Sequence, residues 1–152
     1  MKNLLIAFSF FLVACGGAEK LDETHVSVTV ADPVLNAYFQ LKDAFVRSDM
    51  PTAVKHAKTL AETSIDNEIG KYAVLIFASP DINAQRDHFE ELSNAIVAYS
   101  KSLELPQSMF VQFCPMALNG KGAQWLATEE SILNPYYGER MLRCGAVKET
   151  IN

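Results

Sequence analysis

The chain has 152 residues, of which 49% are hydrophobic, and a formal net charge of −5. This length suits one ordinary domain and leaves little room for a second. The 18 Asp and Glu residues outnumber the 13 Lys and Arg residues, which argues against a nucleic-acid partner, because such proteins carry a basic patch. The same balance argues against electrostatic docking on an anionic membrane. The cysteine count of three is odd and needs an explanation.

The first residues predict an exported lipoprotein. Lys2 precedes an uncharged apolar run over residues 4–13, which is shorter than the about 20 residues of a membrane-spanning helix and fits the core of a secretory signal. The run ends in Val13-Ala14-Cys15-Gly16, which resembles the bacterial lipobox, where small residues precede a lipidated cysteine. We expect a signal peptide over residues 1–14 and acyl chains on Cys15. The alternatives are a plain signal peptide or a buried strand.

Lipidation of Cys15 implies that the mature chain is held at a membrane of the bacterial envelope by acyl chains rather than by a helix. Gly16, rather than Asp, follows the cysteine, and this favours the periplasmic face of the outer membrane. Residues 15–31 contain two glycines and several charges without a helical period, and they are predicted to form a tether. The remaining residues, 32–152, are predicted to form a single domain.

Residues 32 to about 103 predict four amphipathic helices. Each begins after a side chain that can cap it, namely Asp32, Asp49, Asn67 or Asp66, and Asp81. Apolar residues then recur at spacings of three and four, most regularly in the last helix. These are Val34, Leu35, Tyr38, Leu41, Phe45, Val54, Ala57, Leu60, Ala61, Ile69, Tyr72, Ala73, Ile76, Phe77, Ile82, Phe89, Leu92, Ile96, Tyr99 and Leu103. The pattern predicts a mainly α fold, an up-and-down four-helix bundle.

The C-terminal third, about residues 107–152, lacks the helical pattern of the residues before it. Residues 109–113 and 123–127 are predicted to be short strands, with a third possible over 147–151. Turns are predicted over 119–122 and 134–138, which are rich in Gly, Asn and Pro. This part is too irregular to stand alone. We expect a small β-containing cap that packs on the bundle.

The two remaining cysteines lie in this cap, and each has a methionine nearby. Cys114 and Met116 are two residues apart, so in an extended segment both sulfurs point the same way. Met141 and Cys144 are three apart, which places them on one face of a helical turn. Two thiolates and two thioethers form a soft donor set that favours Cu(I). His88, on the fourth predicted helix, is the candidate nitrogen ligand.

Other interpretations of the cysteines remain open. In an exported protein, a Cys114–Cys144 disulfide would close a loop of about 30 residues and stabilise the fold by roughly 3–4 kcal/mol. Met116 and Met141 would then be core residues. Free buried thiols are a third possibility. No His-Glu-x-x-His or Walker spacing occurs in the sequence, and we expect no enzymatic activity.

Several strings resemble an uncharacterised bacterial periplasmic domain family. They are Gln85-Arg86-Asp87-His88-Phe89, Leu92-Ser93, Phe110-Val111-Gln112-Phe113-Cys114-Pro115-Met116-Ala117, Gly122-Ala123-Gln124-Trp125-Leu126, Asn134-Pro135-Tyr136-Tyr137-Gly138 and Met141-Leu142-Arg143-Cys144-Gly145. The resemblance covers about residues 33–152. Members of that family occur as lipoproteins and fused to the membrane-fusion subunits of copper/silver-type efflux pumps.

The resemblance implies a role near heavy-metal efflux components. The Cys-Pro-Met string also resembles one in short heavy-metal-binding domains, although the adjoining His and second Cys-x-x-Cys of those domains are absent. The leading hypothesis is therefore non-enzymatic binding of copper or another soft heavy metal by Cys114, Met116, Met141 and Cys144, with His88 optional. The alternative is a structural or adaptor lipoprotein, with a Cys114–Cys144 disulfide, that binds another envelope protein.

Overall fold

Residues 30–152 are described by a computed structural model of the chain. The predicted signal peptide, the lipidated Cys15 and the tether up to residue 29 lie outside the described residues. Within residues 30–152, no helix is both long enough and apolar enough to cross a membrane.

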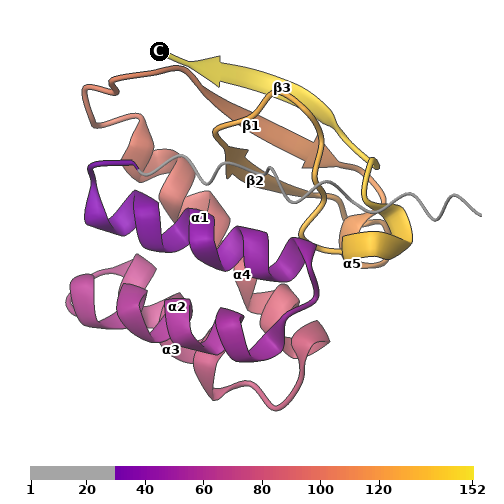
Figure 1. Ribbon diagram of the computed structural model, residues 1–152, viewed down its shortest axis with the longest axis horizontal. Helices are drawn as coiled ribbons and strands as arrows, with labels where there is room; N and C mark the ends of the chain where they lie inside the picture. The colour runs from indigo at the N-terminus through magenta and orange to yellow at the C-terminus, as the bar shows by residue number, and fades with distance from the viewer. Residues whose placement is uncertain (1–29) are drawn as a thin grey trace, which may run out of the picture.

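Four helices make up the first part of the described chain (Figure 1): α1 (Pro33–Val46), α2 (Met50–Thr63), α3 (Glu68–Ala78) and α4 (Ile82–Ser100). The predicted caps are confirmed, because a side-chain oxygen of each accepts a hydrogen bond from a backbone N–H in the first turn. At α3 the cap is Asn67, which accepts from the Gly70 N–H at 3.2 Å, rather than Asp66.

The fourth helix ends at Ser100, three residues earlier than the prediction. The N–H groups of Ser102 and Leu103 donate to the carbonyls of Tyr99 and Ser100, at 2.9 and 3.2 Å. These bonds span three residues rather than four, so the chain tightens into a turn and leaves the helix.

The apolar stripes predicted from the sequence meet in one core. Helix α1 packs on α2, α2 on α3 and α3 on α4, and α1 also contacts α4. Aromatic rings fill the middle, where Phe89 stacks on Tyr38 with 5.5 Å between ring centroids and meets Phe45 edge-on at 4.9 Å. The prediction of a mainly helical chain is thus confirmed.

A three-stranded antiparallel sheet follows, with the order β2-β1-β3. Its strands are β1 (Met109–Cys114), β2 (Ala123–Ala127) and β3 (Ala146–Ile151), so all three predicted strands are present. Figure 1 shows the sheet lying over α1 and α4, and β2 contacts α4. The small β-containing C-terminal part is therefore confirmed as well.

Two predicted turns contain short helical segments. The segment α5 (Ala117–Gly120) overlaps the turn expected over 119–122, but Leu118 and Asn119 have positive φ, of 51° and 60°, and break its regularity. A 3₁₀ turn, η1 (Gly138–Met141), follows the turn expected over 134–138. Gly138 has a φ of 57°, and as a glycine it adopts this left-handed backbone conformation, which links the turn to η1, without strain.

The contact between the start of α3 and the end of α2 yields a first stability prediction. A Cβ on Gly70 would lie 1.9 Å from the Ser64 carbonyl oxygen. We expect Gly70→Ala to lower the free energy of unfolding by about 3 kcal/mol, because backbone must move to relieve that overlap. Chemical denaturation measures the change. As the control, the exposed neighbour substitution Lys71→Ala should change the free energy of unfolding by no more than about 0.5 kcal/mol. A Gly70→Ala chain as stable as the parent would contradict the predicted clash.

Candidate functional site

The fold brings the two cap cysteines together. The Sγ atoms of Cys114 and Cys144 lie 2.8 Å apart, and both residues are free cysteines. The Cys114 side chain is fully buried, whereas Cys144 is partly exposed. We call these two residues the thiol pair.

Strand pairing explains why residues 30 positions apart meet. Cys114 is the last residue of β1, and it lies opposite Ala123 of β2. On the other side of β1, Phe113 lies opposite Ala146, the first residue of β3. Because Cys144 comes two residues before β3, the sheet register sets it beside the end of β1.

The buried side chain of Asn134 fixes the turn that carries Cys144. Its Nδ2 donates to the Cys144 carbonyl at 2.8 Å, and its Oδ1 accepts from the backbone N–H groups of Tyr136 and Tyr137 at 2.8 and 3.2 Å. Its own N–H donates to the Leu142 carbonyl at 2.9 Å. Asn134 thus ties one turn to the other. The sequence predicted a turn at 134–138 but gave no sign of this link.

Gly145, the residue after Cys144, is packed against Trp125, the only tryptophan of the sequence. Its φ is 142°, and a Cβ there would lie 3.0 Å from both Cη2 of Trp125 and the Phe113 carbonyl oxygen. A larger residue would therefore be strained and crowded. The fully buried Trp125 ring lies against the residue that follows Cys144, so its fluorescence can report on the thiol pair.

The two methionines flank the thiol pair differently. The Cys144 N–H donates to the Met141 carbonyl at 3.0 Å, which is the helical-turn spacing that the sequence predicted. Met116 is 51% exposed, and its carbonyl accepts a hydrogen bond from the Tyr137 hydroxyl. The idea that Met116 would be a core residue, which belonged to the disulfide interpretation, is therefore wrong.

His88 lies on α4 and is half-buried. Among residues 30–152, no three His, Cys, Asp or Glu side chains gather in a group that could hold a metal ion, so His88 does not join the two cysteines as the optional nitrogen ligand expected from the sequence. The described part of the chain thus brings together two sulfurs and no cluster of harder donors around them.

The environment of Cys144 raises its pKa above the ordinary value of 9.0, chiefly through its hydrogen bond with Cys114, then through burial and the nearby Cys114 charge. Because the thiolate is the reactive form, we expect the alkylation rate of Cys144 to keep rising with pH beyond 9.0. In Cys114→Ala the main cause is gone, so the midpoint of the rate profile should shift to lower pH. Iodoacetamide labelling across a pH series measures both midpoints, and equal midpoints would contradict the coupling.

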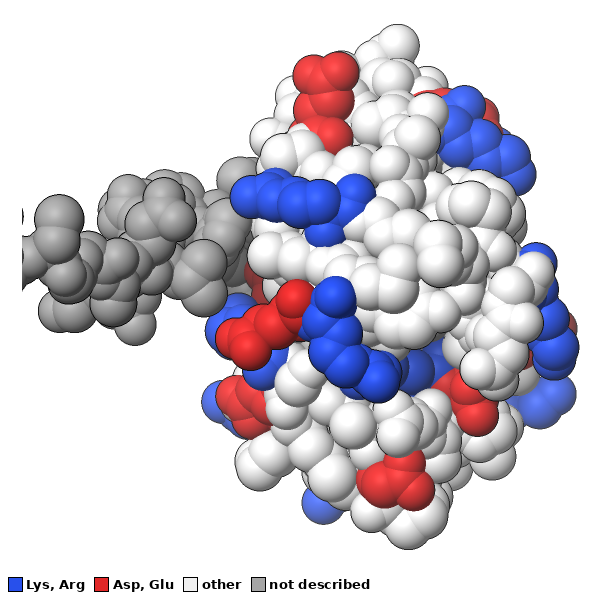
Figure 2. All heavy atoms as spheres, turned by 90° about the vertical axis from the view of Figure 1, so that its right-hand side faces the viewer, with Lys and Arg blue, Asp and Glu red and all other residues white. Residues whose placement is uncertain are grey.

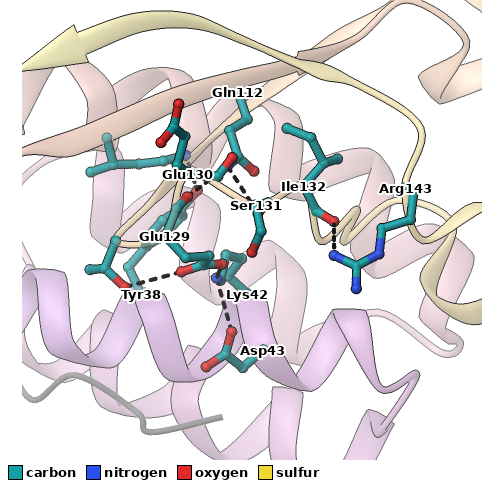
Figure 3. Close-up of polar contacts among 11 residues, drawn as sticks. Tyr38, Lys42, Asp43, Gln112, Glu129, Glu130, Ser131, Ile132 and Arg143 are labelled. Carbon is teal, nitrogen blue, oxygen red and sulfur yellow. Dashed lines mark hydrogen bonds and ion pairs between the residues drawn. The ribbon is translucent and has the colours of Figure 1, made fainter. Parts of the chain in front are cut away.

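A second polar cluster holds the segment after β2 (Figure 3). The buried Lys42 on α1 forms ion pairs with Asp43, at 3.0 Å, and with Glu129. From the other side, Gln112 Nε2 on β1 lies within hydrogen-bonding distance of three successive carbonyls over residues 129–131. These contacts fix the start of the long connection that leads to Cys144. Neither Lys42 nor Gln112 had been singled out from the sequence.

The same connection is held again near the thiol pair. Arg143 Nη1 donates to the Ile132 carbonyl at 3.2 Å (Figure 3). The side of the molecule that carries α5 is largely uncharged across its middle, with both basic and acidic side chains around it (Figure 2).

A separate apolar surface lies at α3 and the turn before it. Ile65 is 75% exposed, Val74 44% and Leu75 38%. The outer side of α3 is mixed, because Glu68 and Lys71 are exposed on it as well. We call Ile65, Val74 and Leu75 the α3 patch.

Part of the chain matches a known protein family. No curated protein and no solved structure matches the chain. The matched segment, residues 34–108, runs from the second residue of α1 to the residue before β1, so the thiol pair lies outside it. Over that segment the chain matches the family described as protein of unknown function (DUF3347).

Proposed function

We propose that this chain is a lipid-anchored protein of the bacterial envelope that binds copper, as Cu(I), or another soft heavy metal without catalysing a reaction. The ligands are the thiolates of Cys114 and Cys144, with the thioethers of Met116 and Met141 as further donors. The observation that carries the proposal is that the fold places the Sγ atoms of Cys114 and Cys144 side by side.

The chemistry of the donor set supports a soft ion over a hard one. Thiolates and thioethers select soft ions, and copper(I) foremost, whereas structural zinc sites use four Cys or His ligands. The described residues bring together two thiols with no third His, Cys, Asp or Glu. A soft ion that accepts few ligands therefore fits this pair better than zinc does.

The rest of the proposed role concerns location and partners. We propose that the four helices form an up-and-down bundle that serves as a rigid frame for the cap, and that acyl chains on Cys15 hold it at the outer membrane. The resemblance to domains found with copper/silver-type efflux pumps supports metal-efflux components as partners. The acidic composition gives no support to nucleic acid.

A copper titration tests the ligand assignment. The reduced Cys15→Ser chain, which lacks the third thiol, is titrated anaerobically with Cu(I) against a competing chelator, with Trp125 fluorescence as a second signal. We expect close to one equivalent to bind, and we expect Cys114→Ser and Cys144→Ser each to abolish binding. Met50→Leu, a methionine on α2, is the matched control and should bind normally. Tight binding that survives loss of both cap cysteines would overturn the site.

A second candidate function is a structural or adaptor lipoprotein that binds another envelope protein. The exposed α3 patch favours it, since apolar surface of this kind marks interaction sites. In that case Cys114 and Cys144 form a disulfide that stabilises the cap. Protein that contains no free cap thiols when taken directly from the envelope, and that takes up no copper after reduction, would support the adaptor over the metal site.

A further inference from the structure

The two sulfurs of the thiol pair differ in their access to solvent. The Cys114 side chain is 0% exposed, whereas Cys144 is partly exposed. Their Sγ atoms nevertheless lie in contact, at 2.8 Å. A reagent that approaches from solvent therefore meets Cys144 first, with the Cys114 sulfur directly behind it.

We propose that Cys144 is a site of thiol–disulfide exchange, where a mixed disulfide forms with an external disulfide, and that Cys114 is the thiol that resolves it. This activity goes beyond metal binding and does not depend on it. The chemical class of the reactant is a small disulfide, because the reaction needs only that one sulfur reach Cys144.

The exchange has two steps, and its atoms and electrons balance. The Cys144 thiolate attacks one sulfur of the external disulfide RSSR, whose S–S bond breaks, so that Cys144–S–S–R forms and RS⁻ leaves. The Cys114 thiolate then attacks the Cys144 sulfur, displaces a second RS⁻ and leaves a Cys114–Cys144 disulfide. The cysteines lose two electrons in all, RSSR gains them, and the two cysteine protons pass to the two RSH products.

The backbone around the pair suits this order of events. Cys144 is held at its carbonyl by Asn134 and through its N–H by the Met141 carbonyl, so its partly exposed side chain sits on a fixed turn. Cys114 lies at the end of β1, the central strand of the sheet. With the two sulfurs already in contact, the resolving step needs no rearrangement of the fold.

Single-cysteine chains test the difference in access. Cys15→Ser/Cys114→Ser retains only Cys144, and Cys15→Ser/Cys144→Ser retains only Cys114. Each reduced, metal-free chain is mixed with 5,5′-dithiobis(2-nitrobenzoic acid), and release of the coloured thiol is followed. We expect the Cys144 chain to react at least about tenfold faster than the Cys114 chain, and the two rates to become equal in denaturant. Equal rates in the folded chains would overturn the proposal.

The chain with both cap cysteines tests the resolving step. Cys15→Ser should release two equivalents of the coloured thiol and retain none, because Cys114 displaces the group first bound at Cys144. Acid quenching at early times followed by peptide mapping should find the trapped group on Cys144. A group trapped on Cys114, or two groups retained per chain, would contradict the assignment without relying on either serine variant. No metal is present in any arm, so these results and those of the copper titration can fail separately.

Discussion

Replacing Arg86 with alanine is expected to lower the free energy of unfolding by about 3–5 kcal/mol. Arg86 lies on α4 and is almost fully buried. Its Nε donates to the Pro135 carbonyl at 2.7 Å, and its Nη2 donates to the Phe45 carbonyl at 2.7 Å and to the Ser48 hydroxyl at 3.1 Å. One side chain thus joins α4, the end of α1 and the cap, and its loss leaves these acceptors without their donor.

The guanidinium group is essential to this role. Burial, and secondarily the charge of Arg140, lowers the pKa of Arg86 to about 10, so the side chain is still protonated at neutral pH. Arg86→Lys should recover only part of the loss, because an ammonium group cannot reproduce the planar fork that meets three acceptors. Urea unfolding followed by circular dichroism measures both variants. The exposed Arg140→Ala is the control and should lower the free energy of unfolding by less than about 0.5 kcal/mol. An Arg86→Ala chain as stable as the parent would contradict this role of the Arg86 hydrogen bonds.

Removing Glu129 is expected to cost about 2–4 kcal/mol, because it leaves the ammonium group of Lys42, which is 2% exposed, with Asp43 alone. The double substitution Lys42→Met/Glu129→Ala should be more stable than Glu129→Ala, since it removes the buried charge together with its partner. The unfolding free energies of Lys42→Met, Glu129→Ala and the double variant, combined in a double-mutant cycle, give the interaction energy between Lys42 and Glu129.

The chain offers a matched exposed pair as the control. Lys101 and Glu149 lie 2.8 Å apart, but each side chain is 45% exposed. Glu149→Ala should therefore change the stability by less than about 1 kcal/mol. If Glu129→Ala and Glu149→Ala had equal effects, burial of Lys42 would not be what makes the inner pair important.

Local signals explain why so much of the helical part could be predicted. Asp32, Asp49 and Asp81 each stand directly before a helix, and a capping side chain acts within three residues of its own position. The strands β1 and β2 could also be predicted, because the alternation of apolar and polar residues and the neighbouring glycines are local features. Both kinds of signal require only the adjacent sequence.

The features that build the candidate site could not be found in that way. Asn134 looked like an ordinary turn residue, yet its amide holds Cys144 ten positions away. Arg86 and Lys42 have partners in the cap, 49 and 87 positions along the chain. Such pairings depend on how the cap packs against the helices, which no local pattern encodes.

The sequence also could not tell apart the two methionines near the thiol pair. Spacing alone gave Met116 and Met141 equivalent places beside their cysteines. In the fold Met116 is 51% exposed, since it follows β1 at the point where the chain leaves the sheet. Exposure of this kind depends on which segments cover the strand end, and here the nearby contact comes from Tyr137.

The most direct test of the metal-binding proposal is the copper content and the thiol state of the native protein, measured on the same sample taken from the envelope. We predict about one copper per chain, with Cys114 and Cys144 reduced but protected from alkylation until a chelator removes the metal. A metal-free protein whose two cap cysteines are joined in a disulfide would contradict the metal site.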